Sequence, residues 1–414
     1  HTQLADEAIC IGPGPSAQSY LNMEQIISAT MVSGADAIHP GFGFLSENAR
    51  FAELCEKCGI TFVGPPSKVI RMLGNKKIAR STMIAAGVPV VPGSEGDVED
   101  IETGLKEAER IGYPVIIKAA LGGGGKGMRV ANTPEEFPEA YATARKESEI
   151  AFGDGTMYIE HFVVNPRHIE FQILADSFGN VIHLGERDCS IQRNHQKMIE
   201  ESPSAAVSSE LREKMGHAAV TAAKAAGYVN AGTIEFLLEP DGKFWFMEMN
   251  TRIQVEHPVT EWVTGIDLVK EQLKIASGMP LEISQEDVRI QGHAIECRIN
   301  AENPQKNFRP SPGTIQGAHF PGGNGIRVDT CVYNGCKIPP YYDSMLAKLI
   351  VHAGNRKEAI AKMQSALGEV IIDGIDTNID YQYEILKDED YQSGNFDTGF
   401  LASHIIAGVK INEN

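Results

Sequence analysis

Short apolar runs alternate with helix-like stretches near the start of the chain, and this alternation predicts a parallel α/β unit. The expected strands lie at residues 8–11, 37–40 and 60–64. A helix is expected over residues 67–86, because Gly87, Pro89 and Pro92 would end it there. The first strand has no earlier strand to pair with, so we expect the first sheet to lack its start.

A second region, residues 97–147, has the pattern of a small separate lobe in which a glycine-rich loop joins two short strands between two helices. Beyond it the chain becomes richer in strands, which predicts an α/β fold that is α+β in parts. The further strands are expected at residues 157–160, 167–176, 231–239, 243–250, 293–300 and 325–330. The further helices are expected at residues 208–226, 356–369 and 379–387.

The strands at residues 231–239 and 243–250 flank the turn sequence Pro-Asp-Gly and predict a β-hairpin. A loop of two or four residues would place Glu235 opposite Glu248 on one face, with Cβ atoms about 5 Å apart. A loop of three residues would place the two side chains on opposite faces. We expect the facing arrangement.

The stretch MEMNTRIQVEHP, residues 247–258, has a polar side chain at every even position from Glu248 to Glu256. Two facing carboxylates repel unless a cation separates them, and Asn250 adds an amide oxygen, so the set suits Mg²⁺ or Mn²⁺. The competing interpretation is a strand with one solvated face. Fully extended, residues 248–256 would span about 26 Å, too far for one site, so we expect the strand to end near Asn250.

Four consecutive glycines follow a predicted strand that ends in Lys118, in KAALGGGGKGMRV. They are Gly122, Gly123, Gly124 and Gly125. Backbone without Cβ atoms can approach phosphate oxygens closely. The loop is neither a Walker A loop, which needs Lys-Ser/Thr, nor a Rossmann fingerprint, because a strand follows it. A loop between antiparallel strands could instead close over a nucleotide as a mobile flap.

Composition narrows the function classes. Acids outnumber bases by 55 to 37, for a net charge of -18, which argues against nucleic-acid binding. No apolar run is long enough to cross a membrane, and we expect a cytoplasmic protein. The seven cysteines, spread along the chain, fit reduced thiols, and Cys55 with Cys58 is better explained as a helix face than as a metal site.

Several motifs together resemble the ATP-grasp superfamily: YPVIIKAALGGGGKG, FMEMNTR and the hairpin acids. HPGFGFLSEN (39–48), RDCSIQRNHQK (187–197) and EMNTRIQVEHPVTE (248–261) narrow the resemblance to biotin carboxylases. It implies an N-terminal α/β domain at residues 1–75, whose first few tens of residues are missing, and an ATP-grasp domain at 76–290. It also implies a lid at about residues 92–165 and a C-terminal β-rich domain at 291–414.

The resemblance also implies a reaction and its partners. ATP and bicarbonate would give carboxyphosphate, which carboxylates N1′ of biotin on a biotin carboxyl carrier protein. No AMKM-type biotinylation sequence occurs, so we expect a free-standing subunit or an excised domain. The resemblance implies that it acts with carboxyltransferase subunits and forms a homodimer. Acetyl-CoA carboxylase, and hence fatty acid biosynthesis, is one context; pyruvate and propionyl-CoA carboxylases share the same module.

Site residues are carried over from the family one position at a time. The ATP-binding residues would be Lys76, Lys118, the four glycines, Glu160, Val163, His168, Gln192, His195, Glu235 and Glu248. The metal ligands would be Glu235, Glu248 and Asn250. Bicarbonate would meet Arg252, Gln254 and the backbone N–H of Val255, with Lys197 near the transferred phosphate. Glu256 would be the base that deprotonates bicarbonate, and Arg298 would stabilise the enolate-like oxygen of deprotonated biotin.

Two other interpretations stay open from the sequence. One is an ATP-grasp ligase that activates a different carboxylate as an acyl phosphate. The other is a non-catalytic nucleotide-binding or scaffolding subunit, for which Glu256→Gln would change nothing. The complete set of charged residues argues against the second.

Overall fold

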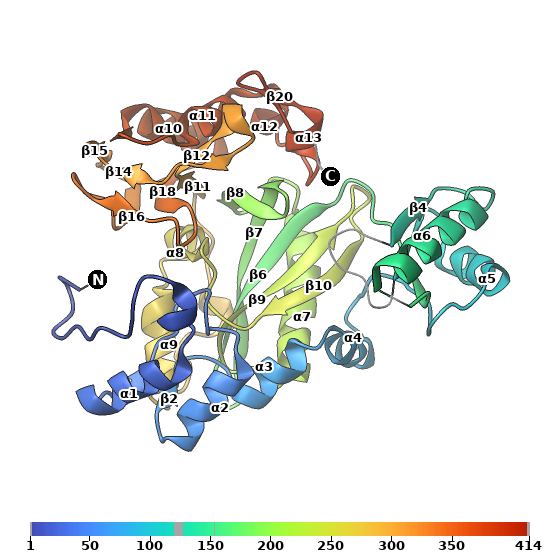
Figure 1. Cartoon of the computed structure of the whole chain (residues 1–414), viewed down its shortest axis with the longest axis horizontal. Helices are drawn as coiled ribbons and strands as arrows, with labels where there is room; N and C mark the ends of the chain where they lie inside the picture. The colour runs from blue at the N-terminus through green and yellow to red at the C-terminus, as the bar shows by residue number, and fades with distance from the viewer. Residues whose placement is uncertain (1, 120–126, 153, 412–414) are drawn as a thin grey trace. The chain divides into compact units, whose positions relative to one another are not determined.

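The computed structural model describes residues 2–119, 127–152 and 154–411 (Figure 1). The chain divides into two compact units. Unit 1 comprises His1–Val88, Arg167–Leu238 and Glu248–Asn414, and unit 2 comprises Pro89–Pro166 and Glu239–Met247. None of the described helices is both long enough and apolar enough to span a membrane.

The N-terminal part of unit 1 pairs two short strands in parallel, as the alternating pattern predicted. Its elements are α1 (Met23–Ser33), β1 (Ala37–Ile38), α2 (Ala49–Lys57), β2 (Thr61–Phe62), α3 (Ser67–Leu73) and α4 (Lys76–Ala85). The strand expected at residues 8–11 is wrong, because these residues pair with no described strand. The helix expected at 67–86 is two helices, because Asn75 accepts a hydrogen bond from Ile78 N and caps α4.

The centre of unit 1 is an eight-stranded sheet in the order β10-β9-β6-β7-β8-β11-β18-β16. Its strands are β6 (Arg167–Ala175), β7 (Val181–Arg193), β8 (Gln196–Ser202), β9 (Asn230–Leu238), β10 (Phe244–Asn250), β11 (His293–Asn300), β16 (Ile326–Thr330) and β18 (Met345–Ala353). The pairings from β9 to β16 are antiparallel. Nearly every residue of β6 is buried, so charged side chains on these strands must find partners inside the protein.

Helices cover both faces of this sheet. They are α7 (Ser209–Ala225), α8 (His257–Thr264), α9 (Leu268–Ala276) and α10 (Arg356–Glu369). Alternate residues of β11 face two apolar clusters: Ala294 packs with Val259 of α8, and Ile295 packs with Ala359 of α10. Each strand position therefore has a fixed side, which decides where the site residues point.

The remaining C-terminal residues form short antiparallel pairs and small helices around α10 (Figure 1). The strands are β12 (Glu302–Asn303), β13 (Arg309–Pro310), β14 (Gly313–Thr314), β15 (Gly317–His319), β17 (Lys337–Ile338), β19 (Ile371–Asp373), β20 (Ile405–Ile406) and β21 (Val409–Lys410). The helices are α11 (Ile379–Lys387), α12 (Glu389–Ser393) and α13 (Phe400–Ser403). The helices predicted at residues 356–369 and 379–387 are confirmed as α10 and α11.

Unit 2 contains a three-stranded antiparallel sheet in the order β4-β3-β5. Its elements are α5 (Ile101–Ile111), β3 (Val115–Ala119), β4 (Met128–Ala131), α6 (Phe137–Phe152) and β5 (Met157–His161). The antiparallel pairing of the two strands that flank the glycine run is confirmed. The four glycines, residues 122–125, lie outside the described residues.

The hairpin loop differs from the prediction. Glu239 N donates to Lys243 O at 2.7 Å, so the loop has three residues, Pro240 to Gly242, and not two or four. Gly242 adopts a φ of 87°, which such loops require. The prediction failed because the left-handed residue adds one position to the loop.

An irregularity within β10 restores part of the expected facing arrangement of Glu235 and Glu248. Phe246 and Met249, three positions apart, are both buried, whereas Met247 between them is 40% exposed. Alternation therefore slips by one residue along β10, as at a bulge. The predicted end of the strand at Asn250 is confirmed.

Candidate active site

Lys197 lies at the centre of a buried group of carboxylates. Its Nζ donates to Glu170 at 2.6 Å, to Glu256 at 2.7 Å and to Glu235 at 3.0 Å. An ammonium group has three N–H donors, so three acids satisfy it completely. Burial alone lowers the pKa of Lys197, but the charges of Glu170 and Glu256 outweigh burial and raise the pKa well above its usual value. Lys197 is therefore a fixed positive charge.

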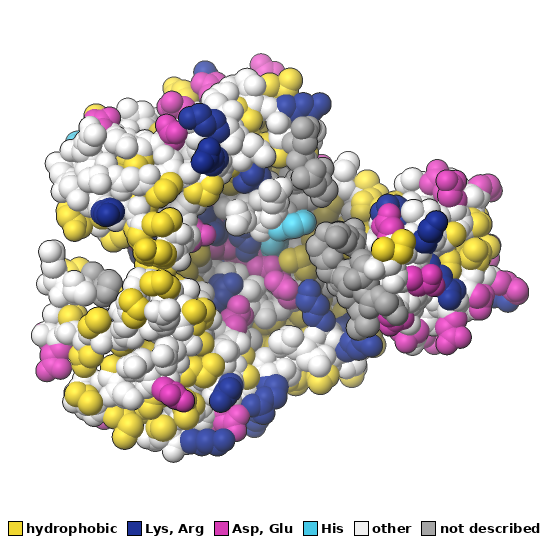
Figure 2. Space-filling view, viewed as in Figure 1, with side chains coloured by type: hydrophobic (Ala, Val, Ile, Leu, Met, Phe, Trp, Pro, Cys, Tyr) yellow, Lys and Arg dark blue, Asp and Glu magenta, His cyan; other side chains and the backbone are white. Residues whose placement is uncertain are grey.

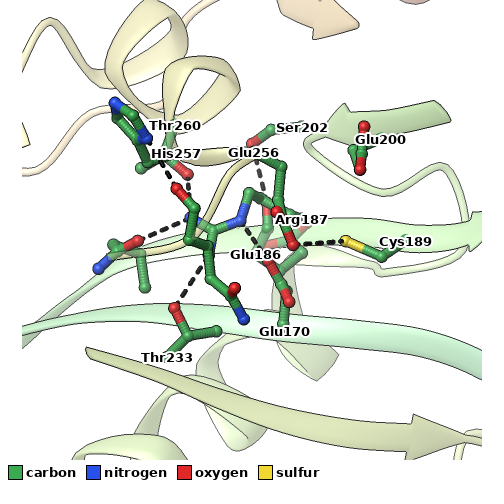
Figure 3. Close-up of polar contacts among 12 residues, drawn as sticks. Glu170, Glu186, Arg187, Cys189, Glu200, Ser202, Thr233, Glu256, His257 and Thr260 are labelled. Carbon is green, nitrogen blue, oxygen red and sulfur yellow. Dashed lines mark hydrogen bonds and ion pairs between the residues drawn. The ribbon is translucent and has the colours of Figure 1, made fainter. Parts of the chain in front are cut away.

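Arg187 of β7 supports this group from within the sheet and is fully buried. Its Nε donates to Glu170 at 2.5 Å, and its other nitrogens reach Gln172, Thr233 and Thr260 between 2.8 and 3.0 Å (Figure 3). The rigid guanidinium thus joins β6, β7, β9 and α8 through one side chain. We infer that it holds Glu170 in place beneath Lys197.

Glu256 precedes α8 and lies between two cations. Its Oε1 accepts from Lys197 and its Oε2 accepts from Arg298 Nη2 at 2.8 Å. Burial raises the pKa of Glu256, but Lys197 and Arg298 outweigh it and hold the pKa well below its usual range. Glu256 is consequently a carboxylate at neutral pH, with a direction fixed by two hydrogen bonds.

Glu235 of β9 links this group to the edge of the sheet. Its Oε1 accepts from Asn250 Nδ2 at 2.9 Å and from Gln254 Nε2 at 3.1 Å. His168 Nε2 lies 3.0 Å from its Oε2. Burial raises the pKa of Glu235, but the charges of Lys197 and His168 outweigh burial. The net pKa is lowered, so Glu235 is ionised.

Glu248 is the acid whose environment fits a metal ion. Burial and then the charge of Glu235 raise its pKa, and Lys76 at the start of α4 offsets this only in part. The two carboxylates are therefore close enough to repel, although the loop has three residues. A divalent cation would remove this repulsion, and Asn250 supplies a third oxygen, so Glu235, Glu248 and Asn250 fit Mg²⁺ or Mn²⁺.

After Asn250 the chain turns back as predicted, which brings Arg252 and Gln254 together. Arg252 Nη1 donates to Gln254 Oε1 at 2.5 Å, and its Nη2 donates to Asn250 Oδ1 at 3.2 Å. Arg252 Nε also donates to Glu47 at 3.0 Å. Val255 accepts a hydrogen bond from Lys348 through its carbonyl oxygen at 2.9 Å. These contacts form a compact polar loop beside Glu235.

The turn between β7 and β8 carries two predicted nucleotide-binding residues. Asn194 and His195 both have positive φ, 48° and 62°, as in a two-residue type I′ hairpin turn. His195 is exposed at this turn, whereas Gln192 is buried and pairs with Lys197 across the hairpin. Figure 2 shows acidic, basic and histidine side chains gathered in a recess near the middle of the view.

Unit 2 carries the other predicted nucleotide-binding residues. Lys118 Nζ on β3 donates to Glu160 Oε2 on β5 at 2.5 Å, and Tyr158 donates to the other oxygen at 2.9 Å. Val163 follows β5 and is half-buried. Lys118 and Glu160 are thus already paired within their own sheet.

Several residues of the site were missed from the sequence, namely Glu47, Glu170, Arg187 and Glu200. Glu47 lies within HPGFGFLSEN and Arg187 begins RDCSIQRNHQK, so both were inside recognised motifs. Glu170 lies two positions after His168 and therefore on the same face of β6. The polar residues at alternate positions of this strand, His168, Glu170 and Gln172, were the signal that could have found it.

The fold and the site together define an ATP-grasp ligase: a large antiparallel sheet with paired acids at one edge, and a small sheet around a glycine-rich connection. Family models match in three parts. The ATP-binding domain of the carbamoyl-phosphate synthase L chain matches residues 75–284, and the N-terminal and C-terminal domains of biotin carboxylase match residues 1–70 and 296–403.

Relatives agree over almost the whole chain. Biotin carboxylase 1 of Bacillus subtilis is 57% identical over 409 residues, which cover 99% of this chain and 91% of the relative. Biotin carboxylase of Nostoc is 57% identical over 401 residues, which cover 97% and 90%. The chain belongs to the biotin carboxylase family.

Solved structures show the same fold. The biotin carboxylase domain of a thermophilic 2-oxoglutarate carboxylase bound to bicarbonate is 49% identical, with a TM-score of 0.92 over 98% of this chain and 89% of that one. A dimer of the Hydrogenobacter thermophilus domain contains MgADP, ADP and bicarbonate; it is 51% identical, with a TM-score of 0.85 over 98% and 89%.

Proposed function

We propose that this chain catalyses the ATP-dependent carboxylation of biotin at N1′ by bicarbonate, through carboxyphosphate. The observation that carries the proposal is Glu256, an ionised acid held between Lys197 and Arg298 in a chain of this family. Bicarbonate oxygen attacks the γ-phosphorus of ATP, the bond to ADP breaks, and carboxyphosphate and ADP result. Carboxyphosphate then delivers its carboxyl group to N1′ of biotin, and the phosphate that it releases takes the N1′ proton.

Glu256 is proposed to take the proton of bicarbonate. Proton removal by a positioned carboxylate contributes about 10² to 10⁴ in rate. Because Lys197 and Arg298 lower the pKa of Glu256, it is a weak base, so the acidity of bicarbonate must rise as well. The guanidinium of Arg252 supplies a positive charge for that purpose, and Gln254 and the N–H of Val255 orient the anion.

Arg298 is proposed to stabilise the negative oxygen that forms on the ureido group when biotin loses its N1′ proton. An arginine stays charged at all relevant pH values and donates in a fixed plane. Arg298 donates from Nε to Glu200 and from Nη2 to Glu256, and these two hydrogen bonds fix the plane of the guanidinium. Lys197 is proposed to lie near the transferred phosphate.

In unit 1, Lys76, His168, Gln192 and His195 are the proposed ATP-binding residues, together with the metal ligands Glu235, Glu248 and Asn250. A bound Mg²⁺ would neutralise charge on the phosphate groups of ATP. In unit 2, Lys118 and the four glycines are proposed to bind phosphate groups, and backbone groups of Glu160 and Val163 to frame the adenine. We propose that residues 92–165 act as a lid.

The finer biological assignments are also proposals. They are a biotin carboxyl carrier protein as the carrier of the substrate, carboxyltransferase subunits as further partners, a homodimer and a cytoplasmic location. The division into domains at residues 1–75, 76–290 and 291–414 is proposed on the same basis. The dimer of the Hydrogenobacter thermophilus domain supports the proposed homodimer.

The test is ADP release with ATP, Mg²⁺ and bicarbonate, measured with and without free biotin. Bicarbonate-dependent release that free biotin stimulates is the expected result. Release that depends on another carboxylate and ignores biotin would indicate a different ATP-grasp ligase. ATP binding without any turnover would indicate a scaffolding subunit.

A further inference from the structure

Two glutamates, Glu200 and Glu296, lie beside Arg298. Glu200 of β8 is the antiparallel partner of Glu296 of β11, and both side chains are fully buried. Directly paired residues point to the same face, with Cβ atoms about 5 Å apart. The two carboxyl groups are therefore neighbours, and Figure 3 shows Glu200 on its strand beside the Arg187 cluster.

The oxygen atoms of this pair are only partly satisfied. Glu200 Oε1 accepts from Arg298 Nε at 2.6 Å. Glu200 Oε2 and both oxygens of Glu296 are buried and have no hydrogen-bond partner among the described residues. An ionised carboxylate is strongly disfavoured in such surroundings, whereas a carboxylic acid has an O–H that can bond to a neighbouring carboxylate.

The surroundings of Glu296 offer no free cation among the described residues. The charged groups that face it are Lys348 of β18, Glu200 of β8, Arg298 of its own strand and Glu256 before α8. Lys348 Nζ already donates to Val255 O at 2.9 Å and lies 3.2 Å from Asp329. Arg298 is occupied by Glu200 and Glu256.

Apolar residues cover the part of this face that lies under α8. Ala294 and Ile350 share it with Glu296 and pack against Val259 of α8. Burial raises the pKa of Glu296 well above its usual value, and Lys348 counteracts this only in part. Burial also raises the pKa of Glu200, to about 7, against the effect of Arg298.

We propose that Glu200 and Glu296 share one proton and that the pair positions the Arg298 guanidinium. Glu296 donates its O–H to Glu200 Oε2, and Glu200 keeps the negative charge that holds Arg298 Nε. Glu296 is thus a positioning residue that acts through Glu200. The inference rests on the proposed function, because the role of Arg298 is part of that function.

The first test is thermal unfolding of Glu296→Gln between about pH 5.5 and 8.5. If Glu296 is protonated only in the folded chain, the unfolded chain binds fewer protons above its ordinary pKa, so stability falls as pH rises. Glutamine cannot lose a proton and still offers an N–H to Glu200. The Tm of the variant relative to the unmodified chain should therefore rise with pH.

Glu186→Gln is the matched control, because Glu186 of β7 is equally buried but paired with an arginine. It accepts from Arg212 Nε and from Arg212 Nη2, each at 2.6 Å. An arginine stays charged throughout this pH range. This variant should lose a nearly constant amount of stability across the same pH range. A similar constant loss for Glu296→Gln would overturn the proposal.

Biotin-dependent turnover gives an independent reading. Glu296→Gln should keep the rate within about threefold, because the amide still donates to Glu200. Glu296→Leu, which cannot donate, should lower the biotin-dependent kcat at least about tenfold and leave the KM for ATP unchanged. Equal rates for the two variants would contradict a positioning role.

An infrared measurement tests the shared proton without relying on the variants, and one combination of results separates the shared proton from the proposed function. Infrared spectra of the unmodified chain at neutral pH should contain an un-ionised carboxyl band that Glu296→Gln loses; absence of any such band overturns the shared proton, even if the variants do not fold. If the unmodified chain shows no biotin-dependent turnover but Tm behaves as expected, the proposed function fails and the shared proton stands.

Discussion

Two groups of carboxylates in unit 1 differ in how their charge is balanced. The inner group, Glu170 and Glu256, is held by Arg187, Lys197 and Arg298 through hydrogen bonds of 2.5 to 2.8 Å. At the edge of the sheet, no hydrogen bond from a described residue lowers the pKa of Glu248, and the charge of Glu235 raises it. The protein itself neutralises the first group, whereas Glu248 at the edge keeps a repulsion that the proposed Mg²⁺ would remove.

The difference separates preorganisation from ligand binding. Inner residues keep their positions before any substrate arrives, which favours stabilising charge as it develops in a reaction. The edge acid would gain its full stabilisation only with the proposed cation bound. Changes to the inner group should therefore affect catalysis and folding, and changes at the edge should affect metal affinity.

The largest effect is expected from Glu256→Gln. It removes the proposed base but keeps its shape, so biotin-dependent ADP release should fall about 10² to 10⁴-fold. The matched control is Glu210→Gln, since Glu210 is exposed and pairs only with Lys214 among the described residues. Unchanged release by Glu256→Gln would place the scaffolding interpretation ahead of the enzyme.

The next effect tests the inner group as a folding unit. Arg187→Met leaves the buried Glu170 with Lys197 but without its guanidinium partner, which should cost about 3 kcal/mol of unfolding free energy. Denaturant unfolding measures it. Adding Glu170→Gln should recover part of the loss, because the carboxylate that lost the guanidinium is then removed as well. A loss that the second substitution does not reduce would mean that packing, not charge, is responsible.

At the edge, Glu248→Gln should raise the Mg²⁺ concentration needed for half-maximal turnover by about tenfold or more, because one anionic ligand is lost. Mg²⁺ affinity of the unmodified chain should also rise with pH, since the raised pKa of Glu248 lets protons compete with the metal. Titration of ADP release with Mg²⁺ at several pH values checks both. A Glu248→Gln curve that overlays that of the unmodified chain would remove Glu248 from the metal site.

The smallest effect comes from an ion pair on the surface. Lys214 and Glu210 lie 2.7 Å apart on α7, with side chains 63% and 78% exposed. Lys214→Met should change unfolding free energy by about 0.5 kcal/mol or less, because water screens the pair. A loss comparable to that of Arg187→Met would show that burial is not what separates the two groups.

Local patterns predicted those features that depend on neighbouring residues. The ends of α10 and α11 and the end of β10 at Asn250 follow from short-range signals. The loop length at Pro240 did not, because a positive φ at Gly242 decided it. The burial of Arg187 against Glu170 depends on the order of β6 and β7 in the sheet, which no local pattern contains.

The site residues also divide into those that local motifs predict and those that depend on how the strands pair. Motifs identified Glu256, Lys197 and Arg298, but their mutual hydrogen bonds required the folded sheet. Glu200 and Glu296 had no motif of their own, since their neighbourhood arises from the pairing of β8 with β11.

The most direct test of the central claim follows the carbon atom. The chain is incubated with ATP, Mg²⁺, ¹³C-labelled bicarbonate and free biotin, and the products are separated by mass spectrometry. Labelled N1′-carboxybiotin is the expected product, formed only with ATP and lost in Glu256→Gln. ADP that accumulates while all label remains in bicarbonate, or equal labelling by Glu256→Gln, would contradict it.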